Sequence, residues 1–329
     1  MNISILIDKK RKLEAFGSIP DSLKNNLDDW FSIELTYSSN AIEGNTLTRQ
    51  ETALIIEKGI TVGGKSIKEH LEAINHVKAF NWIKDLIKKK HKTITEKDIL
   101  NIHALILEGI DNLNAGSYRK VKVRIAGSLV VLPNPLKVPN LMEKFIKWLQ
   151  NNKNLHPVEL AAEAHYRLVT IHPFVDGNGR TARLLMNLIL MMHGYPPAII
   201  RKKDRLNYIN FLEKARLGGS KKDYFKLIAK AIERSLDIYL QALYEKKNNI
   251  IFKDNNYRLL KIGELAKKVG ESITTIRYWT KEKLLEVTEI TKSGYQLYNL
   301  NMINRIKQIK KLKKQRYSLK EIKQKLNLK

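Results

Sequence analysis

The sequence predicts a mainly α-helical chain that carries one small β-hairpin and ends in a winged helix-turn-helix domain. Through most of residues 1–244, apolar side chains recur at steps of three and four, the spacing of a buried helix face. Residues 121–133 instead alternate apolar and charged side chains, which is the pattern of a strand pair. In residues 258–329, two short helical patterns flank a glycine, as in a helix-turn-helix.

The composition is that of a globular chain without cysteine. Its 329 residues are enough for two domains, and a hydrophobic content of 43% is ordinary. The lack of cysteine excludes disulfides and thiolate metal sites. No segment approaches the roughly 20 apolar residues of a membrane helix, and the apolar N-terminus is too short for a secretory signal. We expect a cytoplasmic protein without a membrane partner.

Positive charge is concentrated towards the C-terminus. The formal net charge is +27, from 60 Lys and Arg against 33 Asp and Glu. Residues 253–329 hold 20 of these cations and only 7 of the acids. An AT-rich genome favours lysine in its proteins, and this would raise the charge of the whole chain. The uneven distribution therefore favours a polyanionic partner, such as DNA, for the C-terminal segment.

The N-terminal region, residues 1–110, is predicted to contain several amphipathic helices. The first runs from about residue 21 to residue 44, because Gly44 adopts the left-handed conformation of a helix end at little cost. Glu43 then lies in the last turn, where the helix dipole disfavours a carboxylate. It is either a solvated surface residue or the partner of a cation from elsewhere. Further helices are predicted over 48–58, 66–89 and 95–108.

Residues 111–244 contain the predicted hairpin and five further helices. Val121, Val123 and Ile125 alternate with charged residues, and Gly127 lies at the turn. An isolated hairpin is marginal in water, so it either packs flat on the helices or offers its edge to an extended peptide. The helices are predicted over 141–151, 158–171, 181–193, 204–217 and 222–244, and a polar linker over 245–257.

The stretch at residues 172–183, between two apolar helices, holds the chemically distinctive residues. His172 follows a helix end, so its imidazole can reach a cleft and take up a proton near neutral pH. Asp176 offers the hard oxygen that Mg²⁺ prefers. Gly177 and Gly179 allow main-chain N–H groups to face an anion at a helix N-terminus. Further donors that can bind phosphate oxygens come from Asn178, Arg180 and Arg183.

Other interpretations of this stretch are less favourable. Counted from Asp176, it begins like a calcium-binding loop, but Arg180 takes the fifth position and the sixth is not glycine. Residues 172–183 contain no Gly-x-x-x-x-Gly-Lys-Ser/Thr loop, and the chain has no His-Glu-x-x-His pair. His165 and His172 are seven residues apart, which disfavours a zinc site. A bare loop between helices, without a ligand, is the plainest alternative.

Residues 172–183 resemble the Fic motif, His-x-Phe-x-Asp/Glu-Gly-Asn-Gly-Arg-x-x-Arg, at every defined position. Residues 39–44, with Ser39 and Glu43, resemble the family's inhibitory motif, Ser/Thr-x-x-x-Glu-Gly/Asn. The similarity extends over roughly residues 20–235. The chain is thus identified as a member of the Fic/DOC family, and the resemblance implies a Fic-type helical bundle with the hairpin as its flap.

The resemblance implies transfer of AMP from ATP, with Mg²⁺, to a hydroxyl group of a target protein or of this protein itself. His172 would take the hydroxyl proton, and Asp176 would position Mg²⁺. Glu43, with Ser39, would inhibit the enzyme by pairing with Arg183 and diverting it from ATP. The residues expected to hold the phosphates are Gly177, Asn178, Gly179, Arg180 and Arg183. The flap residues expected to dock the target are Arg124, Ile125, Ala126, Gly127, Ser128 and Leu129.

Several alternatives to this enzyme stay open. The Fic domain could sense a nucleotide within a DNA-binding regulator, although an intact His172 favours chemistry. The donor could be another nucleotide, so that UMP or phosphocholine is transferred. Glu43 could also support the removal of AMP, and the chain could form a homodimer.

The C-terminal domain, residues 258–329, begins with helix, glycine turn and helix over 262–281. A turn at Ser293-Gly294-Tyr295 then predicts a two-stranded wing. Residues 262–266 and 275–279 resemble the DNA-binding part of MerR-type regulators. A basic helical module that binds protein is the alternative. The side chains expected to face DNA are Thr274, Thr275, Arg277, Tyr278 and Lys281.

Overall fold

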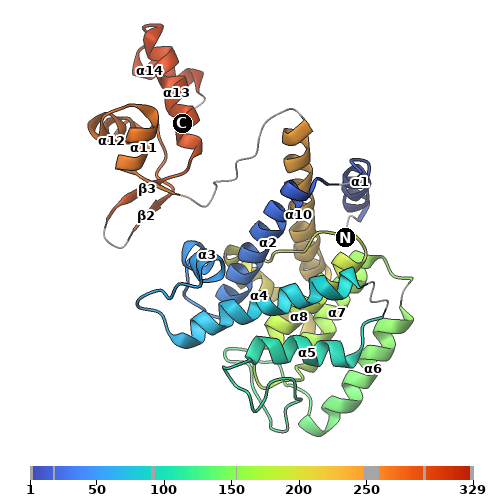
Figure 1. Ribbon diagram of the computed structural model, residues 1–329. Coiled ribbons are helices and arrows are strands. Elements are labelled where there is room, and N and C mark those ends of the chain that lie inside the picture. Colours follow the sequence, from blue (N-terminus) through green and yellow to red (C-terminus); the bar gives the residue numbers. More distant parts are fainter. Residues whose placement is uncertain are drawn as a thin grey trace. The chain divides into compact units, whose positions relative to one another are not determined.

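The computed structural model describes residues 3–17, 19–89, 93–152, 154–247, 259–291 and 294–326. The chain divides into two compact units, residues 1–251 and 252–329. In the described ranges, unit 1 is built from helices, whereas unit 2 adds a small sheet to its helices (Figure 1). None of the described helices is long and apolar enough to cross a membrane.

The described part of unit 1 shares one main hydrophobic core, to which most of its helices contribute. In chain order the helices are α1 (Ile3–Glu14), α2 (Asp21–Ile42), α3 (Arg49–Lys58), α4 (Ile67–Lys88), α5 (Glu96–Leu107), η1 (Pro135–Lys137), α6 (Val138–Asn151), α7 (Pro157–Ile171), α8 (Asn178–Met192), η2 (Lys202–Asp204), α9 (Arg205–Arg216) and α10 (Lys222–Lys247). The core includes Leu6 of α1 and Leu236 of α10, so the two ends of the unit belong to it.

Helix α8 is the centre of unit 1. Nearly every residue from 178 to 190 is buried, and the helix packs against α2, α4, α5 and α7 (Figure 1). Its apolar side chains point in several directions, so they are buried only because neighbouring helices cover it on several sides. Only residues 172–177 join α7 to α8, so this short loop is held at both ends by buried helices.

Local sequence signals explain several helix boundaries. Thr48, Ser66 and Thr95 each accept a hydrogen bond from the main-chain N–H three residues further on, and the acid at that position returns one. Each reciprocal cap satisfies two N–H groups that a helix start leaves unpaired. Helix α2 ends as predicted, with Glu43 as its C-cap and with a φ of 102° at Gly44.

Helix α1 was not predicted, because its sequence is short and basic. It forms on α10, where Leu6 is buried and Lys9 bridges Glu233 and Asp237 at 2.8 and 2.7 Å. Short helices are marginal alone and gain most of their stability from such packing. The elements that stabilise α1 lie more than 200 residues further along the chain.

The prediction of paired strands at 121–133 is wrong. The segment makes a turn, closed by a hydrogen bond of 3.1 Å from Ser128 N to Ile125 O, but it contains no strand. Glu213 of α9 instead accepts hydrogen bonds from the Ser128 hydroxyl at 2.8 Å and from Leu129 N–H at 2.9 Å. An isolated hairpin gains little stability by itself, so the hydrogen bonds to Glu213 of α9 form in place of strand pairing. Residues 121–133 are called the flap below.

Unit 2 has its own core and the predicted helix-turn-helix. Helices α11 (Ile262–Val269) and α12 (Ile273–Lys281) are joined through Gly270, which has a φ of 64°. The core includes Leu265, Ile276 and Trp279. Helices α13 (Asn301–Lys314) and α14 (Leu319–Lys325) complete the described part of the unit.

The sheet of unit 2 is antiparallel, with β3 (Gln296–Tyr298) between β1 (Leu260–Lys261) and β2 (Glu289–Ile290). Leu297 faces Glu289 on one side and Lys261 on the other. The predicted two-stranded wing is therefore present and gains a third strand. Ser293 of the wing turn and residues 248–257 of the predicted linker lie outside the described residues, and residues 245–247 belong to α10.

Candidate active site at residues 172–183

His172 terminates α7 in a conformation that suits a catalytic base. It has a φ of 52°, in the left-handed region, and its N–H donates to Leu168 O at 2.9 Å. The ring Nδ1 lies 3.4 Å from Val169 O, so Nδ1 carries the proton and Nε2 is left as an acceptor. Burial, followed by the charge of Arg216, lowers the pKa of His172 to about 4. The imidazole is therefore neutral at pH 7.

Asn178 and His103 fix the shape of the loop. Asn178 Nδ2 donates to Phe174 O at 2.9 Å, and its Oδ1 accepts from Phe174 N–H at 3.0 Å. His103 of α5 stacks on the Phe174 ring, and its Nε2 donates to Asp176 O at 3.0 Å while Nδ1 accepts from Gly116 N–H. The amide of Asn178, predicted to contact phosphate, is thus engaged within the loop. His103 was missed because it lies far outside the motif.

Arg180 lies between two carboxylates. It is 2% exposed, with Nη1 3.0 Å from Glu72 Oε1 of α4 and Nη2 3.3 Å from Asp176 Oδ2. Asp176 Oδ1 accepts from Gly177 N–H at 2.6 Å. Burial would raise the pKa of Asp176, but Arg180 and this N–H outweigh it and lower the pKa. In this state Arg180 therefore anchors the loop to α4 and keeps Asp176 ionised.

The donor set of the loop fits a magnesium ion that is shared with a polyphosphate. Within the described ranges, no group of three or more His, Cys, Asp or Glu side chains could enclose a metal alone. The Asp176 side chain is 53% exposed and offers one hard carboxylate. Mg²⁺ is commonly held by one or two carboxylates together with substrate phosphates, so further protein ligands are not required.

Arg183 projects from α8 towards α2 and is 3% exposed. Its Nε donates to Ser39 Oγ at 2.9 Å, and its Nη2 donates to Ser39 O at 3.0 Å and to Glu43 Oε1 at 2.7 Å. Burial would lower the pKa of Arg183, but the charge of Glu43 outweighs burial and raises it. The structure thus brings together the two members of the predicted inhibitory pair, 140 residues apart in sequence.

Gly179 lets Glu43 approach the start of α8. A Cβ atom at this position would collide with the Glu43 carboxylate and crowd Arg183 Nη1. Gly177 serves a different purpose, because it is the N-cap of α8 with a φ of 74°. The Glu43 carboxylate therefore lies at a helix N-terminus, a position that favours negative charge and would suit a phosphate.

Arg119 connects this loop to the flap. It is 2% exposed, and its Nε donates to His172 O at 2.8 Å. Its Nη1 donates to Val121 O at 3.2 Å and its Nη2 to Pro133 O at 2.7 Å. One guanidinium thus holds both ends of the flap beside the main chain of His172. No sequence pattern indicates this role, because all three partners are main-chain carbonyls.

Arg216, at the end of α9, carries unused donors. Its Nε and Nη2 are buried and have no hydrogen-bond partner among the described residues. Burial lowers the pKa of Arg216, and its charge in turn lowers the pKa of His172. Buried polar groups without a partner are rare in folded proteins. This arginine was also missed, and it fits a ligand that brings an acceptor oxygen or nitrogen to the site.

The predicted docking and DNA-facing side chains are mostly accessible. On the flap, the exposed members are Arg124, Ala126, Gly127 and Leu129, and the half-buried ones are Ile125 and Ser128. On α12, the exposed members are Thr274, Arg277, Tyr278 and Lys281. Thr275 is half-buried, with its hydroxyl 2.8 Å from the Ser272 hydroxyl. Arg277 and Lys281 also line a cavity of about 520 Å³ that includes Tyr295 and Gln296 of the wing region.

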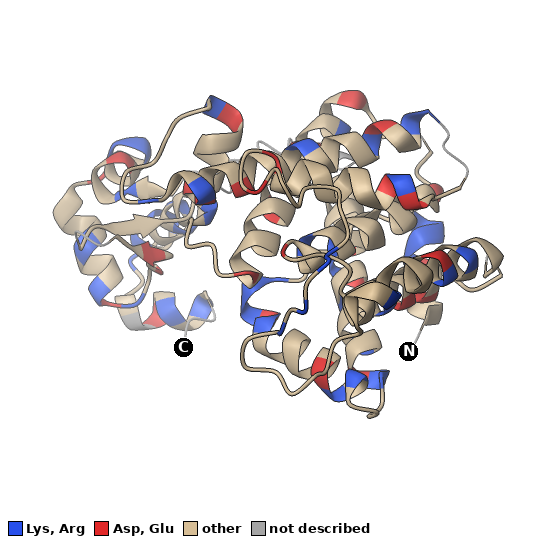
Figure 2. Cartoon of the chain, turned by 90° about the horizontal axis from the view of Figure 1, so that it is seen from below, with Lys and Arg blue, Asp and Glu red and all other residues tan. Residues whose placement is uncertain are grey.

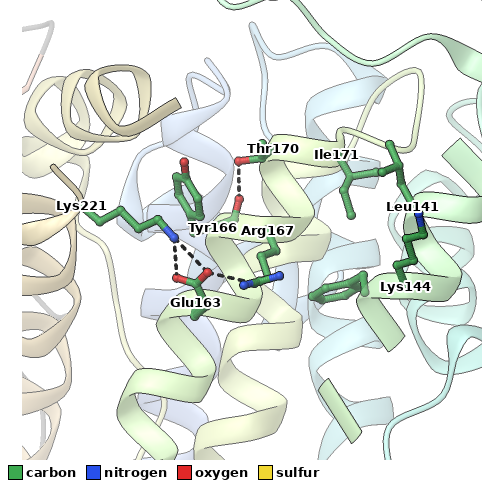
Figure 3. Close-up of a pocket in the computed structure, with 9 residues that line it drawn as sticks. Leu141, Lys144, Glu163, Tyr166, Arg167, Thr170, Ile171 and Lys221 are labelled. Atoms are coloured by element: carbon green, nitrogen blue, oxygen red, sulfur yellow. Dashed lines mark hydrogen bonds and ion pairs between the residues drawn. The ribbon is translucent and has the colours of Figure 1, made fainter. Parts of the chain in front are cut away.

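A cavity of about 390 Å³ beside α7 lies apart from this chemistry (Figure 3). Thr170 and Ile171 line it, but none of residues 172–183 does. Arg167 and Lys221 point at the same carboxylate, that of Glu163, at 2.9 Å each. Both cations are thus engaged by this one carboxylate, and we assign the cavity no part in the site.

The helical bundle and its central loop place unit 1 among proteins of the Fic type, and unit 2 among helix-turn-helix modules. The Fic/DOC family model matches residues 93–190, and the model of the MerR HTH family regulatory protein matches residues 260–329. A Fic domain containing signaling protein from Bacteroides thetaiotaomicron is 31% identical, with a TM-score of 0.66 over 74% of this chain and 98% of that one. The chain belongs to the Fic/DOC family.

Curated relatives add names for the activity. A protein adenylyltransferase Fic from Culex quinquefasciatus is 40% identical over 268 residues, 80% of this chain and 51% of the relative. Its namesake from Nematostella vectensis is 42% identical over 241 residues, 72% of this chain and 55% of the relative. Fic-1 (residues 134–508) from C. elegans is 34% identical, with a TM-score of 0.67 over 74% of this chain and 72% of that one. The chain spans about half the length of the curated relatives it matches.

Proposed function

We propose that the chain is a protein adenylyltransferase that transfers AMP from ATP to a Ser, Thr or Tyr hydroxyl of a target protein. The observation that carries the proposal is the neutral His172, whose free Nε2 lies one short loop away from the N-terminus of α8. A base and a phosphate-binding helix start are the two groups that this transfer needs most. The names of the curated relatives support the same reaction.

In this reaction His172 Nε2 takes the proton of the target hydroxyl. The hydroxyl oxygen attacks the α-phosphorus of ATP, and the bond to pyrophosphate breaks. Main-chain N–H groups in the first turn of α8 bind the phosphate oxygens, because an α-helix leaves these donors unpaired. Asp176 would hold Mg²⁺, which neutralises phosphate charge when bound. Arg183 would bind the γ-phosphate once it is free of Glu43.

The Glu43–Arg183 pair explains how the enzyme would be held inactive. Arg183 is bound to Ser39 and Glu43 through three hydrogen bonds, so its donors face α2 rather than the loop. The Glu43 carboxylate also lies where a phosphate oxygen would bind at the start of α8. A complete ATP would therefore have to displace Glu43 before all its phosphates could bind.

The test is AMP transfer by the full chain with labelled ATP. We expect Glu43→Gly to raise self-modification by about tenfold or more, since a hydrogen bond to a charged group contributes about 1.5–3 kcal/mol. His172→Ala in the same background should abolish it. Glu108→Gly is the matched control, because Glu108 is also an exposed helix C-cap. Equal rates for wild type and Glu43→Gly would refute the inhibitory role.

The same experiment with each labelled nucleotide decides the donor. Labelling from UTP alone would replace AMP by UMP in the proposal. Loss of label from a modified chain that depends on Glu43 would favour removal of AMP. Two further predictions accompany this reaction. The chain is expected to form a homodimer and, because it has no cysteine, to be located in the cytoplasm.

DNA binding by unit 2 is a second proposed function. The supporting observation is that Arg277, Tyr278 and Lys281 lie exposed on α12, the second helix of the helix-turn-helix. In this motif the second helix enters the major groove. The similarity of residues 260–329 to the MerR HTH family favours the same role.

A further inference from the structure

The flap offers an unpaired main-chain edge. The main-chain N–H groups of Lys122, Arg124 and Val131 donate no hydrogen bond to any described residue. Because the flap arms do not pair with each other, these groups must be satisfied by water or by another chain. An extended segment added alongside could pair with them, as in strand addition.

The first arm of the flap is positively charged and lacks acidic partners. Lys122 and Arg124, with Lys120 just before the flap, are exposed, and none of the three forms an ion pair with a described residue. Glu213 is fastened to the second arm by its bonds to Ser128 and Leu129. The local field is therefore positive, and it would attract acidic side chains.

The second arm of the flap is apolar and almost fully exposed. Leu129 is 83% exposed and Val131 is 93% exposed. Two residues apart on an extended segment, they lie on the same side. Isolated apolar residues on a surface are common, but here they adjoin an unpaired main chain beside a catalytic base. A peptide that pairs with the flap would cover both side chains.

The flap is also held in place before any target arrives. Arg119 binds both of its ends, and Glu213 binds the turn. Ordering a binding segment in advance reduces the entropy lost on association. Arg119 also donates to the main-chain carbonyl of His172. The fixed flap therefore sets the distance between a docked segment and His172.

We propose that the flap selects extended acceptor segments that carry Asp or Glu next to the modified hydroxyl and apolar residues at alternate positions. This inference rests on the proposed transferase function and names the chemistry of its target. A protein segment fits better than a nucleic acid, because the flap has no aromatic side chain on which bases could stack. The unpaired main chain likewise matches a peptide.

Peptide binding tests the inference without requiring AMP transfer. Three fluorescent peptides with one central Thr are titrated into full-chain Glu43→Gly by anisotropy at low salt. The first carries flanking Asp and alternate Val, the second has Lys in place of Asp, and the third has Ser in place of Val. We expect the first peptide to bind at least about fivefold more tightly than each of the others, since exposed charges and apolar contacts each add modestly to the affinity.

Charge reversal on the flap is the second part of the test. Lys122→Glu with Arg124→Glu should move the preference towards the Lys peptide. Lys226→Glu with Lys230→Glu, two exposed lysines of α10, should leave it unchanged. Equal binding of the three peptides overturns the inference. So does a preference for the Asp peptide that is unchanged by Lys122→Glu with Arg124→Glu. Tighter flap-dependent binding of a single-stranded oligonucleotide would also overturn it. Failure of the transferase proposal shows separately, as absence of label from ATP in Glu43→Gly.

Discussion

At the scale of single residues, the site is defined by buried arginines whose partners differ. Arg180 has two carboxylates, Arg183 has one, and Arg119 has only carbonyls. Arg216 has no hydrogen-bond partner for two of its nitrogens among the described residues. The family resemblance predicted the pairing of Arg183 with Glu43, but nothing in the sequence indicated Glu72 as the partner of Arg180. Glu72 comes from α4, which the local motif does not contain.

The charge of Arg216 predicts the pH dependence of the reaction. Burial and Arg216 lower the pKa of His172 to about 4, so the base is neutral above that pH. Arg216→Met removes one lowering cause and should raise this pKa towards its ordinary value. The acidic limb of the kcat/KM profile, measured in the Glu43→Gly background, should then move to higher pH. Lys214→Met, at an exposed lysine two residues earlier, is the control. An unmoved limb would show that Arg216 does not act on the base.

The burial of Arg180 predicts a large stability effect at Glu72. Glu72→Leu leaves the guanidinium of Arg180 with the half-exposed Asp176 alone. It also removes the acceptor that Asn45 Nδ2 reaches at 2.8 Å. We expect the free energy of unfolding, measured in urea, to fall by about 3 kcal/mol, because a buried charge is left without a partner. Glu72→Leu combined with Arg180→Leu should recover part of this loss. A double variant no more stable than the single one would contradict a charge effect.

At the scale of elements, helices with their own caps were predictable and elements held by distant contacts were not. The starts of α3, α4 and α5 follow from Thr48, Ser66 and Thr95, because each cap needs only a neighbour three residues away. The flap carries an equally clear alternating pattern, yet its arms do not pair. Alternation predicts an extended backbone, whereas pairing depends on what the rest of the fold supplies.

Arg119 should therefore control the order of the flap. Arg119→Leu removes the donors that hold Val121 O and Pro133 O. Main-chain amides of the flap should then exchange hydrogen for deuterium faster, because local opening costs less free energy. Arg124→Leu replaces an exposed arginine within the flap and should leave exchange nearly unchanged. The same rate in both variants would mean that Glu213 alone fixes the flap.

At the scale of the whole molecule, the chain combines a Fic-type unit, which holds the proposed active site, with a basic helix-turn-helix unit. Lysine and arginine are spread over both units (Figure 2), so net charge alone does not separate a DNA-binding surface from a lysine-rich background. The separation comes from placement, because Arg277 and Lys281 lie on the exposed face of α12 and line the cavity that includes wing residues. The proposed activities also respond to different variables, nucleotide in unit 1 and salt in unit 2.

Salt dependence tests the DNA-binding proposal on the full chain. Binding to duplex DNA should weaken steeply as salt rises, because each phosphate contact releases counterions. Lys281→Ala should reduce the slope of log affinity against log salt by about one, the share of a single phosphate contact. Arg277→Ala should weaken binding by about tenfold if it reads a base edge. Lys226→Ala in unit 1 is the control for general charge. Binding that responds equally to all three changes would assign the affinity to net charge, and α12 would then have no special part in it.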